Sequence, residues 1–198
     1  MILVALVVLA CSGKAVSLAE VRSVNAGAAD DKLYTAMYSS IFEAIKAKAI
    51  NGAFEGMPFG EKLLAIGMHF MGSPYVSGAL ETEGDERLVI NLRELDCVTF
   101  VEYVVAIAKT VEQYDFNGFA KILKDLRYRG DEAISYPSRL HYFSEWILDK
   151  ENKGTLYRTN ASACNAVIKT RIDFMSSHAN LYPRLKADST LVARFREI

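Results

Sequence analysis

The chain of 198 residues is long enough to bury one good-sized hydrophobic core. Hydrophobic residues make up 51% of it and charged residues 24%, which is the composition of an ordinary globular protein. The formal net charge of -1 offers no basic field to a nucleic-acid backbone, so we exclude nucleic acid as a partner.

Residues 1–19 have the pattern of an export leader. Met1 to Ala10 is continuously apolar but too short to cross a bilayer, as is typical of a secretory signal. Cys11 follows in a context that resembles a bacterial lipobox, so lipidation of Cys11 and simple cleavage after a small residue are both open. We predict an exported, periplasmic protein, with membrane anchoring as one alternative, and a linker over residues 20–30.

Two helices are predicted ahead of the first informative turn. Apolar residues recur at helical spacing after Asp30 and Asp31, and a helix is expected to open there and to run to Lys48. A second helix is expected over Phe59–Phe70, in which His69 has a structural role. Neither segment implies chemistry of its own.

Residues 72–78, with the sequence Gly-Ser-Pro-Tyr-Val-Ser-Gly, are predicted to form a compact turn. The terminal glycines allow unusual backbone angles, and Pro74 keeps Ser73 extended. A turn this tight aims Tyr75 in a fixed direction. The acidic segment 79–86 that follows is interpreted as a solvated loop rather than a metal site.

The chain is organised around residues 92–103, where a strand predicted at 87–92 gives way to a helix predicted at about 98–112. Asp96 stands where the N-cap of this helix belongs. Cys97 then lies in the first turn, where the positive helix end and the unpaired amides favour a thiolate. A thiolate is the nucleophile of acyl transfer, and the same amides could stabilise an oxyanion. The alternative is that Cys97 is a small buried hydrophobe.

The cysteines allow two exclusive interpretations. In an oxidising compartment Cys97 and Cys164 could pair, but a nucleophilic Cys97 must stay free. We prefer a free Cys97, with Cys164 as a structural thiol. We find no glycine-rich phosphate loop and no cysteine or histidine spacing suited to zinc, so no cofactor or metal is predicted.

A second informative stretch begins at Ser138, which is predicted to cap a helix with Phe143 and Trp146 facing inward. A rigid helix start that carries arginine, histidine and tyrosine suits an anionic or carbohydrate ligand. The equally weighted alternative is a core helix with ordinary surface residues. The residues concerned are Arg139, His141 and Tyr142.

The remaining segments are predicted to alternate between helix and strand. A helix is expected from Asp115 through Leu126, and a terminal helix within 181–196. Alternating patterns predict strands at 126–129, 154–159 and 170–175.

Taken together, these motifs resemble the NlpC-type branch of papain-like cysteine amidases that act on bacterial peptidoglycan. Residues 72–78 followed by Asp96-Cys97 match the family's G-x-P-Y-x-x-G and D-C. More narrowly, residues 89–102 and 138–146 resemble the N-acetylmuramoyl-L-alanine amidase-like group within it. The resemblance implies an α+β, papain-like domain with extra helices over residues 31–198.

The resemblance also implies roles for individual residues. Cys97 would be the nucleophile, and the Tyr75 hydroxyl would reach the oxyanion side. The substrate would be a muropeptide, a fragment of peptidoglycan, cut at the amide between N-acetylmuramic acid and L-alanine. The residues implied on the substrate side are Asp96, Ser138, Arg139, His141 and Tyr142.

Two departures from the family pattern qualify this expectation. Val98 stands where many peptide-cleaving relatives have serine. The family's general base is a histidine on a strand downstream of the helix that ends this chain, so the domain is expected to be truncated, lacking its C-terminal strands. Loss of the base would cost about 10²- to 10⁴-fold in rate, unless His141 replaces it. The alternative function is a non-catalytic, muropeptide-binding exported lipoprotein.

Overall fold

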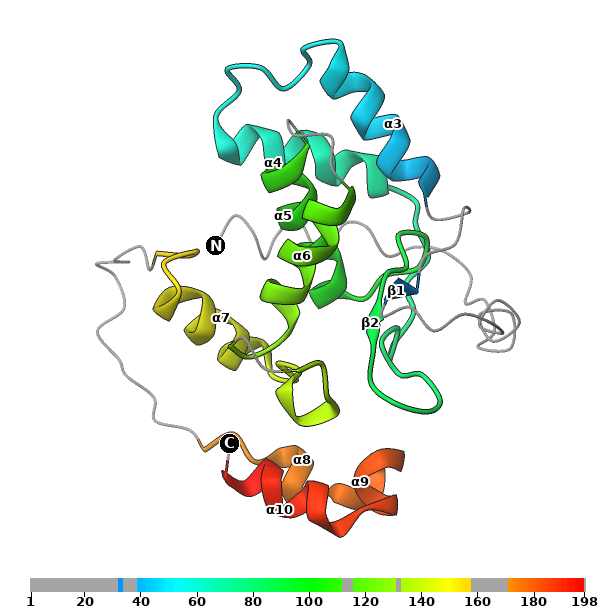
Figure 1. Ribbon diagram of the computed structural model, residues 1–198, viewed down its shortest axis with the longest axis vertical. Helices are drawn as coiled ribbons and strands as arrows, with labels where there is room; N and C mark the ends of the chain where they lie inside the picture. Colours follow the sequence, from blue (N-terminus) through cyan, green and yellow to red (C-terminus); the bar gives the residue numbers. More distant parts are fainter. Residues whose placement is uncertain (1–31, 34–38, 112–115, 131–132, 158–170, 198) are drawn as a thin grey trace. The chain divides into compact units, whose positions relative to one another are not determined.

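A computed structural model describes residues 32–33, 39–111, 116–130, 133–157 and 171–197 (Figure 1). The chain divides into two compact units, Met1–Arg127 and Tyr128–Ile198. The predicted leader, the linker, Cys11 and Cys164 lie outside the described residues. Within the described ranges no helix is long and apolar enough to cross a membrane.

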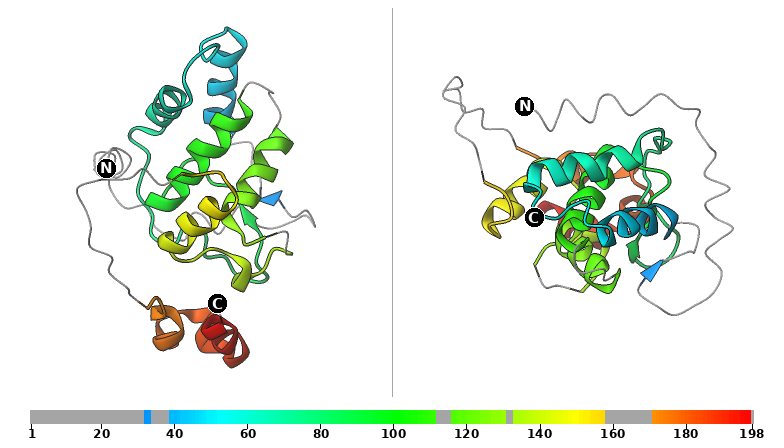
Figure 2. Two further views of the ribbon diagram at one scale, coloured as in Figure 1. Left: turned by 90° about the vertical axis from the view of Figure 1, so that its left-hand side faces the viewer. Right: turned by 90° about the horizontal axis from the view of Figure 1, so that it is seen from above.

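The first unit is built around two neighbouring helices, α5 (Cys97–Thr110) and α6 (Phe116–Arg127). Helix α4 (Phe59–Gly67) packs against α5 and continues into the short 3-10 helix η2 (Met68–Phe70), as Figures 1 and 2 show from different sides. Helix α3 (Ser39–Ile50) contacts η2. The helices predicted at 59–70, 98–112 and 115–126 are thus confirmed, with small shifts at their ends.

Aromatic rings fill the contacts between these helices. Phe42 of α3 packs on Phe119 of α6 with the ring centroids 5.4 Å apart, and Tyr103 of α5 lies 6.4 Å from the same ring. Phe70 meets Phe100 edge-on at 6.0 Å. Tilted and edge-on pairs of this kind add to the free energy gained from area burial, so these rings fix how the helices pack.

Two short strands join the beginning of the unit to the segment before α5. Strand β1 (Lys32–Leu33) pairs in parallel with β2 (Leu88–Val89). The predicted helix start at Asp30 and Asp31 is therefore wrong, since residues 32–33 are a strand and α3 begins only at Ser39. A two-residue strand leaves no periodic signal, and its partner lies far along the chain.

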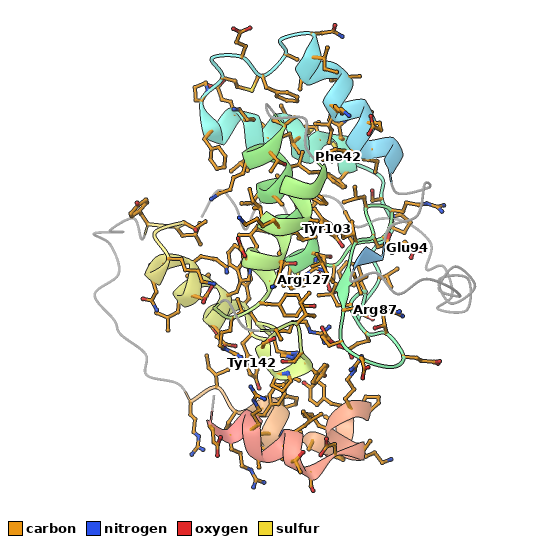
Figure 3. All side chains as sticks on the ribbon, in the orientation of Figure 1. Phe42, Arg87, Glu94, Tyr103, Arg127 and Tyr142 are labelled. Carbon is orange, nitrogen blue, oxygen red and sulfur yellow. The ribbon has the colours of Figure 1, made fainter. Side chains whose placement is uncertain are left out.

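A buried ion pair ties α5, α6 and β2 together. Arg127 Nε donates to Glu102 Oε2 at 2.8 Å, and the two side chains are 1% and 2% exposed. Arg127 also donates to the carbonyl of Val89, to which the Tyr103 hydroxyl donates at 3.4 Å. Figure 3 labels Tyr103 and Arg127. Burial raises the pKa of Tyr103, so its hydroxyl keeps the proton that it donates.

The second unit begins with the 3-10 helix η3 and helix α7 and ends in short helices. Their bounds are η3 (Tyr136–Ser138), α7 (Phe143–Asn152), α8 (Phe174–Ser177), η4 (Ala179–Leu181), α9 (Pro183–Ala187) and α10 (Ser189–Glu197). A small core forms around Tyr136, Met175 and Leu185. Side chains of α10 pack against this core, as the predicted apolar side of a terminal helix requires.

Where the structure describes them, the strands predicted at 126–129, 154–159 and 170–175 are wrong, while residues 158–159 and 170 lie outside the described residues. Arg127 ends α6, and Tyr128 makes only an isolated antiparallel bridge with Arg139. Residues 154–157 are turn and coil, and residues 174–175 open α8. Alternation over four to six residues does not separate a strand from a loop or a helical turn when no neighbouring strand is available.

The predicted terminal helix is two helices, α9 and α10, that are separated at Asp188. Asp188 is extended, and its Oδ1 accepts the Thr190 amide at 2.8 Å. An aspartate that caps a following helix interrupts the preceding one, because its backbone leaves the helical conformation. The break is therefore a local capping effect.

Candidate active site

Cys97 is the first residue of α5, and its side chain is exposed. Asp96 is the N-cap, as predicted, and its Oδ1 accepts the amides of Val98 at 3.0 Å and Thr99 at 2.7 Å. The interpretation of Cys97 as a buried hydrophobe is therefore wrong. A cysteine at this position can meet a ligand that approaches the mouth of the helix.

Thr99 completes a capping box that the sequence reasoning missed. Its Oγ1 accepts the Asp96 amide at 2.9 Å and donates to the Asp96 carboxylate at 2.8 Å. The amides of Val98 and Thr99 are thus occupied by the cap, which leaves the Cys97 amide as the first-turn donor without an acceptor among the described residues. The signal in the sequence was an Asp followed three residues later by Thr.

The cap makes a testable contribution to stability. Replacing Asp96 by alanine is expected to lower the free energy of unfolding by about 1 kcal/mol, because two amides lose their acceptor. Asp96→Asn keeps an oxygen acceptor and should retain most of the stability. Urea unfolding followed by circular dichroism measures both variants, and an alanine variant as stable as the parent would contradict the role of the cap.

The turn at residues 72–78 lies against the segment that opens α5. Its terminal glycines adopt positive φ, +83° at Gly72 and +71° at Gly78, as the sequence predicts. The Leu95 amide donates to the Pro74 carbonyl at 3.1 Å, and the Val76 amide donates to the Leu95 carbonyl at 3.0 Å. These bonds form a parallel bridge between Tyr75 and Leu95. The structure thus brings Tyr75 beside the residues that lead into Cys97.

The predicted cap at Ser138 is wrong. Ser138 ends η3, whose N-cap is Ser135, and the two serines form a reciprocal capping box. Helix α7 begins only at Phe143, which is 40% exposed and stacks on the buried Trp146 at 5.4 Å. The predicted inward position of Phe143 is therefore also wrong. Pro137 favours a helical first turn, and this starts the short helix earlier than expected.

The other residues assigned to the substrate side in this unit make internal contacts. Arg139 is 3% exposed and lies over the Tyr136 ring, 4.9 Å from its centroid. His141 Nε2 donates to the Tyr136 carbonyl at 2.7 Å, because a carbonyl can only accept. The Tyr142 hydroxyl accepts the Met175 amide at 2.7 Å. These side chains hold η3, the start of α7 and α8 together.

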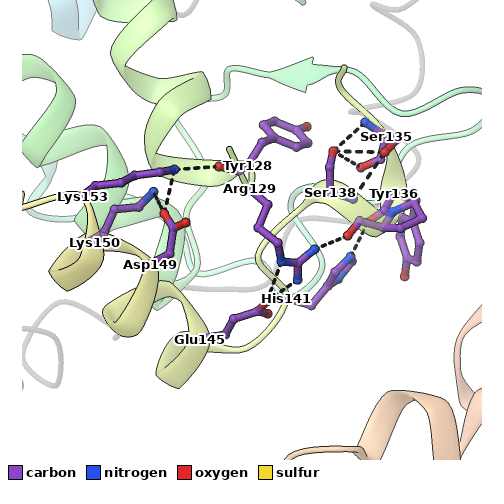
Figure 4. A network of polar contacts seen from close by, with 11 residues as sticks. Tyr128, Arg129, Ser135, Tyr136, Ser138, His141, Glu145, Asp149, Lys150 and Lys153 are labelled. Carbon is purple, nitrogen blue, oxygen red and sulfur yellow. Dashed lines mark hydrogen bonds and ion pairs between the residues drawn. The ribbon is translucent and has the colours of Figure 1, made fainter. Parts of the chain in front are cut away.

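Figure 4 shows a polar network around the same segment. Arg129 pairs with Glu145 and donates to the Pro137 carbonyl, and Lys150 and Lys153 both pair with Asp149. Sequence reasoning missed Arg129, because no motif links it to its partners. Glu145 and Pro137 come near Arg129 only when the chain folds back on itself.

The environment of His141 weakens it as a base. Burial, and next the charge of Arg139, lower the pKa of His141 to about 3. The imidazole is therefore neutral at neutral pH, and a group with this pKa is a poor match for general-base catalysis. This low pKa argues against the alternative in which His141 replaces the family base.

This pKa predicts a stability profile. The unfolded chain binds the His141 proton near pH 6.5 and the folded chain only near pH 3, so acidification favours unfolding between these values. The contribution of the neutral His141 to the free energy of unfolding is fully present above about pH 6.5. Below that pH it should fall by about 1.4 kcal/mol per pH unit. His141→Gln, which keeps a donor for Tyr136, should lack this dependence in urea unfolding. Parallel pH curves for the two proteins would contradict the assignment.

Comparison with known proteins places the chain among amidase-like proteins. A crystal structure of an N-acetylmuramoyl-L-alanine amidase from Bacteroides uniformis is 36% identical with a TM-score of 0.66, covering 70% of this chain and 59% of that one. A second such structure from the same organism is 34% identical, with a TM-score of 0.64 and coverage of 70% and 60%. A Bacteroides fragilis protein proposed to be a xylanase is 38% identical, with a TM-score of 0.62 and coverage of 66% and 58%. No curated protein sequence matches.

The profile of the AmiA-like, N-acetylmuramoyl-L-alanine amidase-like family matches residues 65–198. The chain therefore belongs to this family. It spans 59% of the length of the Bacteroides uniformis amidase. The match includes both the Tyr75 turn and Cys97 in the first unit, and the Ser138 to Tyr142 segment in the second.

Proposed function

We propose that this protein is a cell-wall amidase that hydrolyses the bond between N-acetylmuramic acid and L-alanine in muropeptides, with Cys97 as the nucleophile. Family membership supports an amidase acting on peptidoglycan. The observation that carries the cysteine mechanism is the exposed Cys97 at the start of α5, next to the bridge that holds the Tyr75 turn.

In the proposed reaction the Cys97 sulfur attacks the lactyl carbonyl carbon, and the carbonyl π electrons move to its oxygen. The Cys97 amide and the Tyr75 hydroxyl would donate to this oxyanion. Collapse breaks the carbon–nitrogen bond, and the alanyl amine leaves with a proton. Water then hydrolyses the thioester, which restores the thiol and releases the lactyl carboxylate. We assign no part in these proton transfers to His141, because burial and the charge of Arg139 lower its pKa.

The same features support a finer family assignment. A cysteine that opens a helix after a short strand, with a tyrosine turn bridged to it, supports an NlpC-type, α+β papain-like domain over residues 31–198. We also propose a leader at residues 1–19 and a linker at residues 20–30. The protein would be periplasmic and anchored through Cys11. The substrate-side roles of Asp96, Ser138, Arg139, His141 and Tyr142 stay predictions from the sequence. In the second unit, His141 and Tyr142 are half-buried and Ser138 and Arg139 are buried.

The test is a product assay with defined muropeptides. Peptidoglycan is digested once with a muramidase and once with a lytic transglycosylase, so that both reducing and anhydro sugars are offered. Mass spectrometry should detect free stem peptides that begin with L-alanine, together with the peptide-free sugar. Binding of either digest without these products would contradict the amidase and favour a muropeptide-binding protein.

A further inference from the structure

We propose that Asn91 is a positioning residue, which holds the turn between β2 and α5 and thereby sets Cys97 against Tyr75. Its effect on turnover rests on the proposed function, whereas its effect on the turn does not. Asn91 is 5% exposed, and a buried amide side chain needs hydrogen-bond partners.

The side chain of Asn91 closes the turn from inside. Its Oδ1 accepts the amide of Arg93 at 3.0 Å and the amide of Glu94 at 3.2 Å. Its Nδ2 donates to Glu94 Oε2 at 3.3 Å. One buried side chain thus fixes two successive amides and one carboxylate of the turn. An asparagine side chain that accepts amides two and three residues further on mimics a backbone turn and so holds the chain reversal closed.

The backbone of Asn91 is anchored to the helix that carries the nucleophile. Its amide donates to the Tyr103 hydroxyl at 2.9 Å, and this hydroxyl donates to the Val89 carbonyl. Tyr103 is 1% exposed and lies within α5. The position of Asn91 relative to α5 is therefore set by a side chain that cannot move without disturbing the core.

At its C-terminal end, the turn leads into Leu95, which forms the bridge with Tyr75. Leu95 follows Glu94 directly, exchanges hydrogen bonds with Pro74 and Val76, and precedes the Asp96 cap. Continuous contacts therefore lead from Tyr103 through Asn91 and the turn to Leu95. If Asn91 lost its acceptor, the Arg93 and Glu94 amides would turn to water, and Leu95 would be held on one side only.

A set of variants separates positioning from simple stabilisation. Asn91→Ala is expected to lower kcat for muropeptide hydrolysis by about 10²-fold with little change in KM, because a displacement of about 1 Å misaligns the reacting groups. Asn91→Asp keeps the acceptor but places a carboxylate against Glu94, so its kcat should be intermediate. Adding Glu94→Gln supplies a donor to the new carboxylate and should restore kcat. Asn180→Asp, the same change at an exposed position, is the matched control.

Hydrogen exchange tests the turn without any substrate. In Asn91→Ala the amides of Leu95 and Val76 should exchange at least about tenfold faster, while those of α6 keep their protection. Recovery of this protection in Asn91→Asp/Glu94→Gln would support the proposal. Unchanged exchange at Leu95 and Val76, or a fall in kcat that the double variant does not reverse, would overturn it. If Asn91→Ala speeds this exchange but the unaltered protein releases no stem peptide, the proposed amidase activity is contradicted. The role of Asn91 in holding the turn is then still supported.

Discussion

Replacing Cys97 by alanine is expected to abolish muropeptide hydrolysis, with a loss on the order of 10⁴-fold or more in kcat. The reason is that the thioester cannot form, while donors near the oxyanion can supply only residual catalysis. Because Cys97 is exposed, the free energy of unfolding should change by less than about 0.5 kcal/mol. Release of stem peptides, quantified by mass spectrometry under single-turnover and steady-state conditions, is the measurement.

Two controls make this result specific. Cys164→Ala changes a thiol to which we assign no part in the reaction, and it should leave turnover intact. Cys97→Ser keeps a small polar side chain but has a poorer nucleophile, and it should remain close to inactive. Turnover in Cys97→Ala comparable to the parent would contradict the cysteine mechanism, even if the amidase activity itself is confirmed.

Breaking the buried ion pair should produce the largest effect on stability. Arg127→Met leaves the Glu102 carboxylate buried without its arginine, and we expect the free energy of unfolding to fall by about 3–5 kcal/mol. The loss arises from an uncompensated charge in a site from which water is excluded. Urea unfolding followed by circular dichroism measures it.

Two further variants separate the effect of the uncompensated buried charge from the loss of any ion pair. Glu102→Leu combined with Arg127→Met removes both charges, and most of the lost stability should return. Arg171→Met disrupts a pair with Asp173 whose side chains are 82% and 42% exposed, and it should cost less than about 1 kcal/mol. A loss in Arg127→Met no larger than in Arg171→Met would contradict the role of the buried pair.

Local signals in the sequence located the central part of the candidate site. The Asp96 cap, the cysteine in the first turn of α5 and the glycines of the Tyr75 turn each depend on neighbouring residues, and each was predicted correctly. Helical periodicity also predicted α4, α5 and α6. Failures came where a short segment had to be assigned without its partner, as at β1 and at residues 174–175.

In the second unit, by contrast, local signals in the sequence did not predict what the side chains contact. The segment from Ser138 to Tyr142 was recognised as informative, but the roles of its side chains were not predictable. The structure directs Arg139 onto the Tyr136 ring, His141 to the Tyr136 carbonyl and Tyr142 to α8. A motif shows that particular residues are needed, but whether they face a ligand or the core depends on the elements that fold over them.

The sequence by itself determined where helix α5 begins, which residue caps it and which turn carries the tyrosine. These features arise from interactions within a few residues, where backbone geometry and side-chain chemistry are sufficient. Only the tertiary structure decided that Leu95 joins the tyrosine turn to the helix start, and that Arg127 neutralises Glu102. Contacts between distant residues depend on how the helices pack, and the free energy that selects one packing is summed over the whole core.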